Sequence, residues 1–86
     1  MTKEWSKQYL GIQHYGNVSD VRRATVDHRV THTSDPFTLL SCWYRGCGFS
    51  PDTYIFRGEN SLEDAKKAGE LYTNKGVNPE AEAIEL

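Results

Sequence analysis

Two histidines and two cysteines are the residues of this chain best suited to hold a metal ion. His28 and His32 lie four positions apart, and Cys42 and Cys47 lie five apart. Zinc takes four imidazole or thiolate ligands in a tetrahedron, so these residues would complete one set. Structural zinc sites usually place a tight cysteine pair before the histidine pair, whereas here the order is reversed and the ligands fall on separate segments. The sequence therefore favours half-buried strand histidines and small apolar cysteines, and we expect no metal and no cofactor.

The thiol at Cys47 is the best candidate for a nucleophile. It stands between Gly46 and Gly48 in a predicted loop, where neighbouring Arg45 would lower its pKa. Nucleophilic catalysis also needs a base and an oxyanion hole, and no base is evident nearby. The chain also contains no Gly-x-Ser-x-Gly elbow and no glycine-rich phosphate-binding motif. A disulfide between Cys42 and Cys47 fits the spacing, but reduced thiols are expected in the cytoplasm. We therefore predict a protein without enzymatic activity.

Length and charge set the scale of the protein. The chain has 86 residues, of which 37% are hydrophobic, and a net charge of -2. That is enough for one domain with a small core, which makes a binding surface a more natural product than a deep pocket. We expect a single small α+β domain over residues 1–77, followed by an acidic tail or short helix over 78–86. The polar first seven residues and the absence of a long apolar run predict a cytoplasmic protein without membrane contact.

The remaining chain divides into strands followed by one helix. The β-branched residues and strict alternation of Val21–His32 place Ala24 and Val26 on one face of a strand. Three other segments also have strand character. They are Trp5–Tyr15 (with Gly11 as a bulge or bend), Phe37–Tyr44 and Thr53–Arg57, the last two forming a hairpin.

The best helix is predicted over Ser61–Lys75. Ser61 is a plausible N-cap, Gly76 a plausible stop, and apolar residues recur at helical spacing between them. A further short helix is expected over Glu80–Leu86. The order of these elements predicts a three- or four-stranded, mostly antiparallel sheet with one main C-terminal helix packed on one face.

Basic residues beside aromatic ones suggest nucleic acid as one class of partner. Arg22, Arg23 and Arg29 cluster on the second predicted strand, and arginines near exposed aromatic rings are typical of single-strand RNA binders. The segment 56–68 resembles the last strand and helix of double-stranded-RNA-binding domains. That resemblance implies lysines at the start of the helix, where this chain has Leu62, Glu63 and Asp64, and these carboxylates would repel phosphate. A nucleic-acid-binding module is therefore the alternative rather than the first hypothesis.

The aromatic loop after the third strand favours a protein partner. Trp, Tyr and Arg are the residues that most often dominate protein interfaces. We expect the contact residues Trp43, Tyr44, Arg45 and Phe49, although Trp43 shares a strand face with Phe37 and Leu39 and strand alternation favours its burial in the core. The sequence thus predicts a small protein-binding module, monomeric or homodimeric. The small size and aromatic content suit a phage-type accessory or inhibitor protein that docks on a partner and blocks it sterically. A small zinc- or thiol-containing protein is the third hypothesis.

Overall fold

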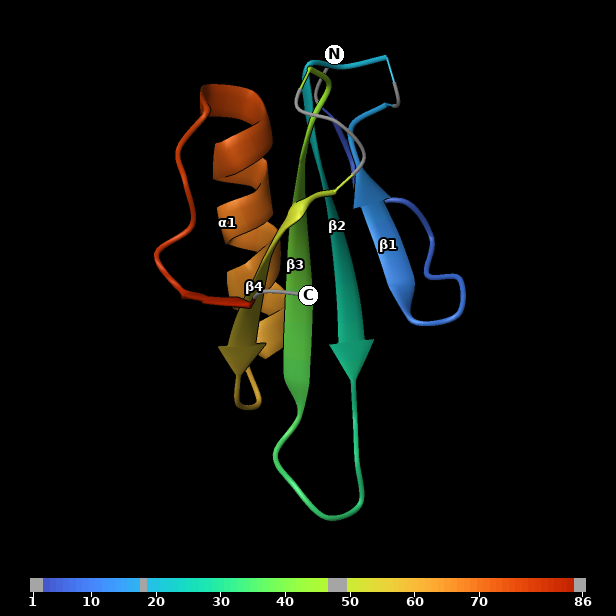
Figure 1. The fold of residues 1–86 in the computed structure, drawn as a ribbon. Coiled ribbons are helices and arrows are strands. Elements are labelled where there is room, and N and C mark those ends of the chain that lie inside the picture. Colours follow the sequence, from blue (N-terminus) through green and yellow to red (C-terminus); the bar gives the residue numbers. More distant parts are fainter. Residues whose placement is uncertain (1–2, 18, 47–49, 85–86) are drawn as a thin grey trace.

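The computed structural model describes residues 3–17, 19–46 and 50–84. It shows an α+β domain in which one helix packs on a five-stranded antiparallel sheet with the strand order β1-β2-β3-β4-β5. Figure 1 shows strands β1 to β4 side by side, with α1 alongside the sheet. The predicted fold class is therefore confirmed, with five strands where three or four were expected. The elements are β1 (Ile12–Tyr15), β2 (Arg22–Arg29), β3 (Phe37–Tyr44), β4 (Asp52–Arg57), α1 (Ser61–Lys75) and β5 (Glu82–Ile84).

The core lies between α1 and the central strands β2 and β3. Leu40 and Val26 are its largest fully buried side chains, and larger, partly buried side chains such as Tyr54 and Phe56 pack around them. The helix approaches the sheet closely at Gly69, since a Cβ atom placed there would lie 3.1 Å from both Ala24 Cβ and Leu40 Cδ1. The missing side chain at Gly69 therefore lets the helix backbone pack densely on the sheet.

Both ends of α1 were located correctly from the sequence, but its N-cap was not. Asn60 rather than Ser61 occupies the N-cap position, and it makes no side-chain capping bond. Ser61 is instead buried, and its hydroxyl lies 2.9 Å from Thr38 Oγ1 on β3. Gly76 ends the helix in the left-handed conformation (φ 70°), which glycine adopts without steric cost.

The two ends of the chain differ most from the predictions. The expected single strand Trp5–Tyr15 is two pieces, because residues 10–11 form a turn and Trp5–Tyr9 folds back beside β1. The expected helix Glu80–Leu86 is wrong within the described residues, where Glu82–Ile84 forms β5 and pairs with β4. Within the described chain, α1 is neither long nor apolar enough for a membrane span.

Candidate functional site

The proposed zinc ligands are not brought together where the structure describes them. The His28 ring nitrogen Nδ1 lies 2.8 Å from Thr38 Oγ1, while His32 stands exposed beyond the end of β2. Cys42 is buried under the helix, and Cys47 lies outside the described residues. Over residues 3–17, 19–46 and 50–84, no three His, Cys, Asp or Glu side chains group together to hold a metal ion.

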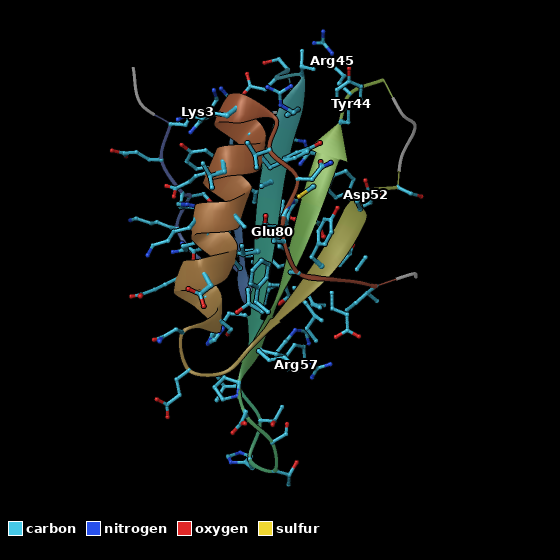
Figure 2. The ribbon with its side chains drawn as sticks, turned by 90° about the vertical axis from the view of Figure 1, so that its left-hand side faces the viewer. Lys3, Tyr44, Arg45, Asp52, Arg57 and Glu80 are labelled. Carbon is cyan, nitrogen blue, oxygen red and sulfur yellow. The ribbon has the colours of Figure 1, made fainter. Side chains whose placement is uncertain are left out.

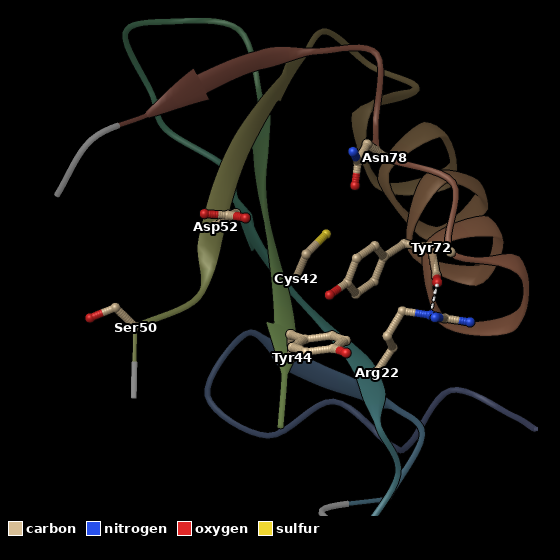
Figure 3. A pocket seen from close by; sticks show the side chains of 8 residues that line it. Arg22, Cys42, Tyr44, Ser50, Asp52, Tyr72 and Asn78 are labelled. Carbon is tan, nitrogen blue, oxygen red and sulfur yellow. Dashed lines mark hydrogen bonds between the residues drawn. The ribbon is translucent and has the colours of Figure 1, made fainter. Parts of the chain in front are cut away.

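A cavity of about 540 Å³ lies between the C-terminal end of α1 and strands β2, β3 and β4. Figure 3 shows Cys42 between Tyr72 of the helix and Asp52 of β4, with Tyr44 and Arg22 below. Arg22 is held at one wall, because its Nε donates a 3.0 Å hydrogen bond to the carbonyl oxygen of Tyr72. This bond places a cation at the negative end of α1, so Arg22 has a structural role there.

The thiol in this cavity is unreactive. Burial raises the pKa of Cys42 to about 12, with a smaller contribution from the charge of Asp52. Thiolate rather than thiol is the nucleophilic form, so Cys42 is protonated and inert near neutral pH. The cavity therefore supports no cysteine chemistry at this position, while the thiol of Cys47 lies outside the described residues.

The predicted partner-binding residues lie on different sides of the sheet. Trp43 points away from α1 and is half-buried, so the expectation that it joins the core is wrong; the core face of β3 carries Thr38, Leu40 and Cys42. Tyr44 points the opposite way and lines the cavity. Figure 2 shows Tyr44 and Arg45 together at one end of the molecule.

Arg45 is hydrogen-bonded within the protein, which leaves Phe49 as the last of the predicted partner-binding residues. The Nη1 of Arg45 donates a 2.7 Å hydrogen bond to the carbonyl oxygen of Ser19, and its backbone nitrogen bonds the carbonyl of Val21. Arg45 therefore ties the end of β3 to the loop before β2. Phe49 lies outside the described residues.

A sheet face without a covering layer is a second candidate surface. Because α1 packs on the other face, the side chains pointing away from it stay half-buried or exposed, apart from Thr53. Among the described helices and strands, none lies over this side of the sheet (Figure 1). We call this surface the open face and define it by its large side chains. They are Ile12, Arg23, Phe37, Leu39, Trp43 and Ile55.

Trp43 stacks with a cationic neighbour at one end of the open face. The Arg23 guanidinium lies 4.5 Å from the centroid of the Trp43 ring, and Trp43 Nε1 donates a 3.3 Å hydrogen bond to Thr25 Oγ1. Strand pairing explains this contact, since Arg23 stands opposite Trp43 in adjacent strands. The indole is therefore held in a fixed orientation by its neighbours.

Most of the other arginines around the open face have a carboxylate nearby within the protein. Arg29 donates two hydrogen bonds, of 2.9 and 2.8 Å, to the Asp27 carboxylate, and these bonds, followed by the carboxylate charge, raise the pKa of Arg29. Arg57 lies 4.0 Å from Glu82. The three arginines proposed for nucleic acid do not form one patch, because Arg22 is on the helix side of the sheet.

Sequence reasoning placed Arg23 and Trp43 in different hypotheses, and did not recognise that they touch. Alternation along each strand gave the side chains that share a face, but the pairing register was needed to set Arg23 beside Trp43. Ile12 and Ile55 were missed as members of the same surface for the same reason. Comparison of the chain with protein-family models, with curated proteins and with solved structures finds no match.

Proposed function

We propose that the protein is a non-enzymatic protein-binding module that docks on its partner through the open face. The observation that carries the proposal is the Trp43–Arg23 pair, which stacks near the Tyr44 end of a sheet face that no described helix or strand covers. Tryptophan and arginine are the residues that most often dominate binding energy when water is excluded around them. Phe37, Leu39 and Ile55 extend the open face as half-buried apolar side chains farther along β3 and β4.

The charges indicate the chemistry of the partner. Arg29 and Arg57 have carboxylate neighbours within the protein, whereas Arg23 has the face of an indole. A carboxylate brought onto Arg23 would add an ion pair without breaking one. The partner surface that fits is therefore an apolar patch that carries a carboxylate at one end, where Arg23 lies. Covering such a patch would act sterically, as an accessory or inhibitor protein does.

The same pairing of charges disfavours nucleic acid as the partner. Phosphate binding relies on several cations that are free to release counterions. The open face has three arginines, Arg23, Arg29 and Arg57, and the last two already lie beside carboxylates. Nucleic acid remains the second hypothesis because Trp43 could stack on a base.

The test combines capture of partners with paired variants. Tagged protein is used to capture partners from the lysate of its own cells, with and without nuclease, and the captured proteins are identified by mass spectrometry. We expect one stoichiometric protein that survives nuclease and is lost with Trp43→Ala combined with Arg23→Ala. The matched control replaces two exposed residues of α1, Lys67→Ala with Leu71→Ala, and should retain the partner.

Two outcomes would contradict the proposal. Loss of all captured material on nuclease treatment would favour the nucleic-acid hypothesis. Retention of the partner by the Trp43 and Arg23 variant, with loss in a Tyr44→Ala and Arg45→Ala variant, would move the docking surface to the end of β3. Circular dichroism of each variant checks that the fold is intact.

A further inference from the structure

The turn before β1 contains a strained leucine. Tyr9 and Ile12 exchange two backbone hydrogen bonds of 3.0 Å, which leaves Leu10 and Gly11 as a two-residue hairpin turn. Both have positive φ angles, 52° for Leu10 and 84° for Gly11. Such turns favour Gly, which has no Cβ atom to crowd the backbone, or Asn, whose short polar side chain tolerates positive φ. The turn with Leu10 is therefore less stable than the same turn with Asn or Gly at that position.

The segment Trp5–Tyr9, which we call the arm, lies along β1 and contacts α1 through Trp5. Its anchor is Trp5, whose ring lies 5.0 Å from that of Tyr15 and reaches a notch at Gly69, where an added Cβ would be 3.1 Å from the Trp5 Cη2 atom. The backbone of Ser6 donates a 2.9 Å hydrogen bond to the carbonyl of His14. Figure 1 shows this segment in blue beside β1.

The contacts of the arm do not depend on which molecule supplies it. They are made to β1 and to α1, and the turn only connects the arm to β1. If the turn opened, a second copy of the chain could insert its own arm along β1 and seat its Trp5 at Gly69. All arm contacts would be kept, while Leu10 would leave the left-handed conformation.

The side chains at the turn are suited to an interface between two copies. Tyr9 is 77% exposed and Leu10 is 83% exposed, although turn positions usually carry polar residues. In an exchanged pair, the register of Tyr9 with Ile12 would bring Leu10 of each copy opposite Gly11 of the other. The two leucines would then be covered by the second copy instead of facing water.

We propose that this protein forms a dimer by exchanging its arms, with Trp5 of each copy seated at Gly69 of the other. The described monomer is the closed form, and residues 10–11 are the hinge. The occupant of the notch and of the β1 edge is a second copy of this chain because its own arm is already complementary to both.

A disulfide between the arm and β1 distinguishes exchange from any other kind of dimer. Ser6 and His14 lie opposite each other, with Ser6 Oγ 2.9 Å from the backbone nitrogen of His14. The variant combines Ser6→Cys and His14→Cys with Cys47→Ser, and buried Cys42 is protected by its raised pKa. We expect oxidation of the concentrated protein to give a covalent dimer on a non-reducing gel. Cross-linking only within monomers, or a protein that stays monomeric by analytical ultracentrifugation at millimolar concentration, would overturn the proposal.

The hinge variant tests the role of strain. Leu10→Asn places a residue that tolerates positive φ at the turn and removes the apolar side chain from the dimer contact, and both changes favour the closed monomer. We expect the dimer dissociation constant to rise about 25-fold, from about fivefold at each of the two hinges. The matched control is Leu71→Gln, which also replaces an exposed leucine by an amide and should leave the constant unchanged. An unchanged constant in Leu10→Asn would overturn the proposal, and neither result depends on the open face.

Discussion

The two faces of the sheet differ in whether a layer covers their large side chains. On the face under α1, the helix approaches the strands closely at Gly69, where an added Cβ would lie 3.1 Å from both Ala24 and Leu40. On the open face, Trp43 and Phe37 stand on the same strand with no layer above them. The missing side chain at Gly69 lets the helix pack densely on its face, whereas large side chains left uncovered provide area for recognition. The difference shows that in this domain the largest aromatic residues of β3 are not those that hold the fold together.

Neighbouring leucines on β3 provide the most direct test of this division. Leu40 is fully buried under the helix, and Leu39 lies half-buried on the open face. We expect Leu40→Ala to lower the free energy of unfolding by about 3 kcal/mol, since it leaves a cavity in the core. Leu39→Ala should cost about 1 kcal/mol or less because less apolar area is lost. Urea denaturation measures both, and equal losses would show that the open face is packed as tightly as the core.

A larger side chain at Gly69 tests the close approach of the helix. Its position is bounded by Ala24, Leu40 and Trp5, each 3.1 Å from an added Cβ. We expect Gly69→Leu to lower the free energy of unfolding by about 1–2 kcal/mol, because the cost of overpacking exceeds the gain from removing a helical glycine. Lys67→Leu, on the exposed side of the same helix, is the control and should change stability little. A stabilised Gly69→Leu variant would mean that the helix can move away from the sheet.

The sequence was sufficient to locate the helix and the central strands, but not to decide which face the helix covers. Alternation in β3 gives two sets of residues, and each contains a leucine, so hydrophobicity alone favoured the set with Trp43. The glycine on α1 becomes informative only when the helix and the sheet are considered together, because a side chain at Gly69 would crowd Ala24 and Leu40.

The two ends of the chain were mispredicted for different reasons, one local and one tertiary. Leu10 is a residue that seldom occupies a turn with positive φ, so Gly11 alone indicated only a bulge or bend in the segment before β1. The short segment Glu82–Ile84 is a strand because β4 offers an edge to pair with, which is a tertiary effect that overrides a weak helical pattern. The contact of Arg23 with Trp43 was likewise hidden, because it depends on the register between two strands.

The buried thiol of the covered face should make stability depend on alkaline pH. The pKa of Cys42 is raised from 9.0 to about 12 in the folded protein, so the unfolded chain releases this proton first. The stabilising contribution is therefore complete below pH 9 and is lost progressively between pH 9 and about 12. We expect the wild type to lose about 1 kcal/mol more than Cys42→Ala between pH 8 and pH 10. Urea denaturation at both pH values checks this, and parallel losses in the two proteins would show that the thiol is accessible to water when folded.

Of the contacts tested, the stacked Arg23–Trp43 pair on the open face should contribute least to the free energy of unfolding. A residue that matters for partner binding but little for stability would mark the open face as a recognition surface. Arg23 lies over the Trp43 ring at the surface, where a cation–π contact is worth about 0.5–1 kcal/mol. We expect Arg23→Ala to lower the free energy of unfolding by no more than this amount, while removing the cation that the partner's carboxylate would meet. Arg23→Lys is the informative control, because it keeps the charge but loses the flat guanidinium that stacks on the indole. If Arg23→Ala lowered the free energy of unfolding as much as Leu40→Ala does, the open face would stabilise the fold as the core does. Its large side chains would then be accounted for by stability, without a binding partner.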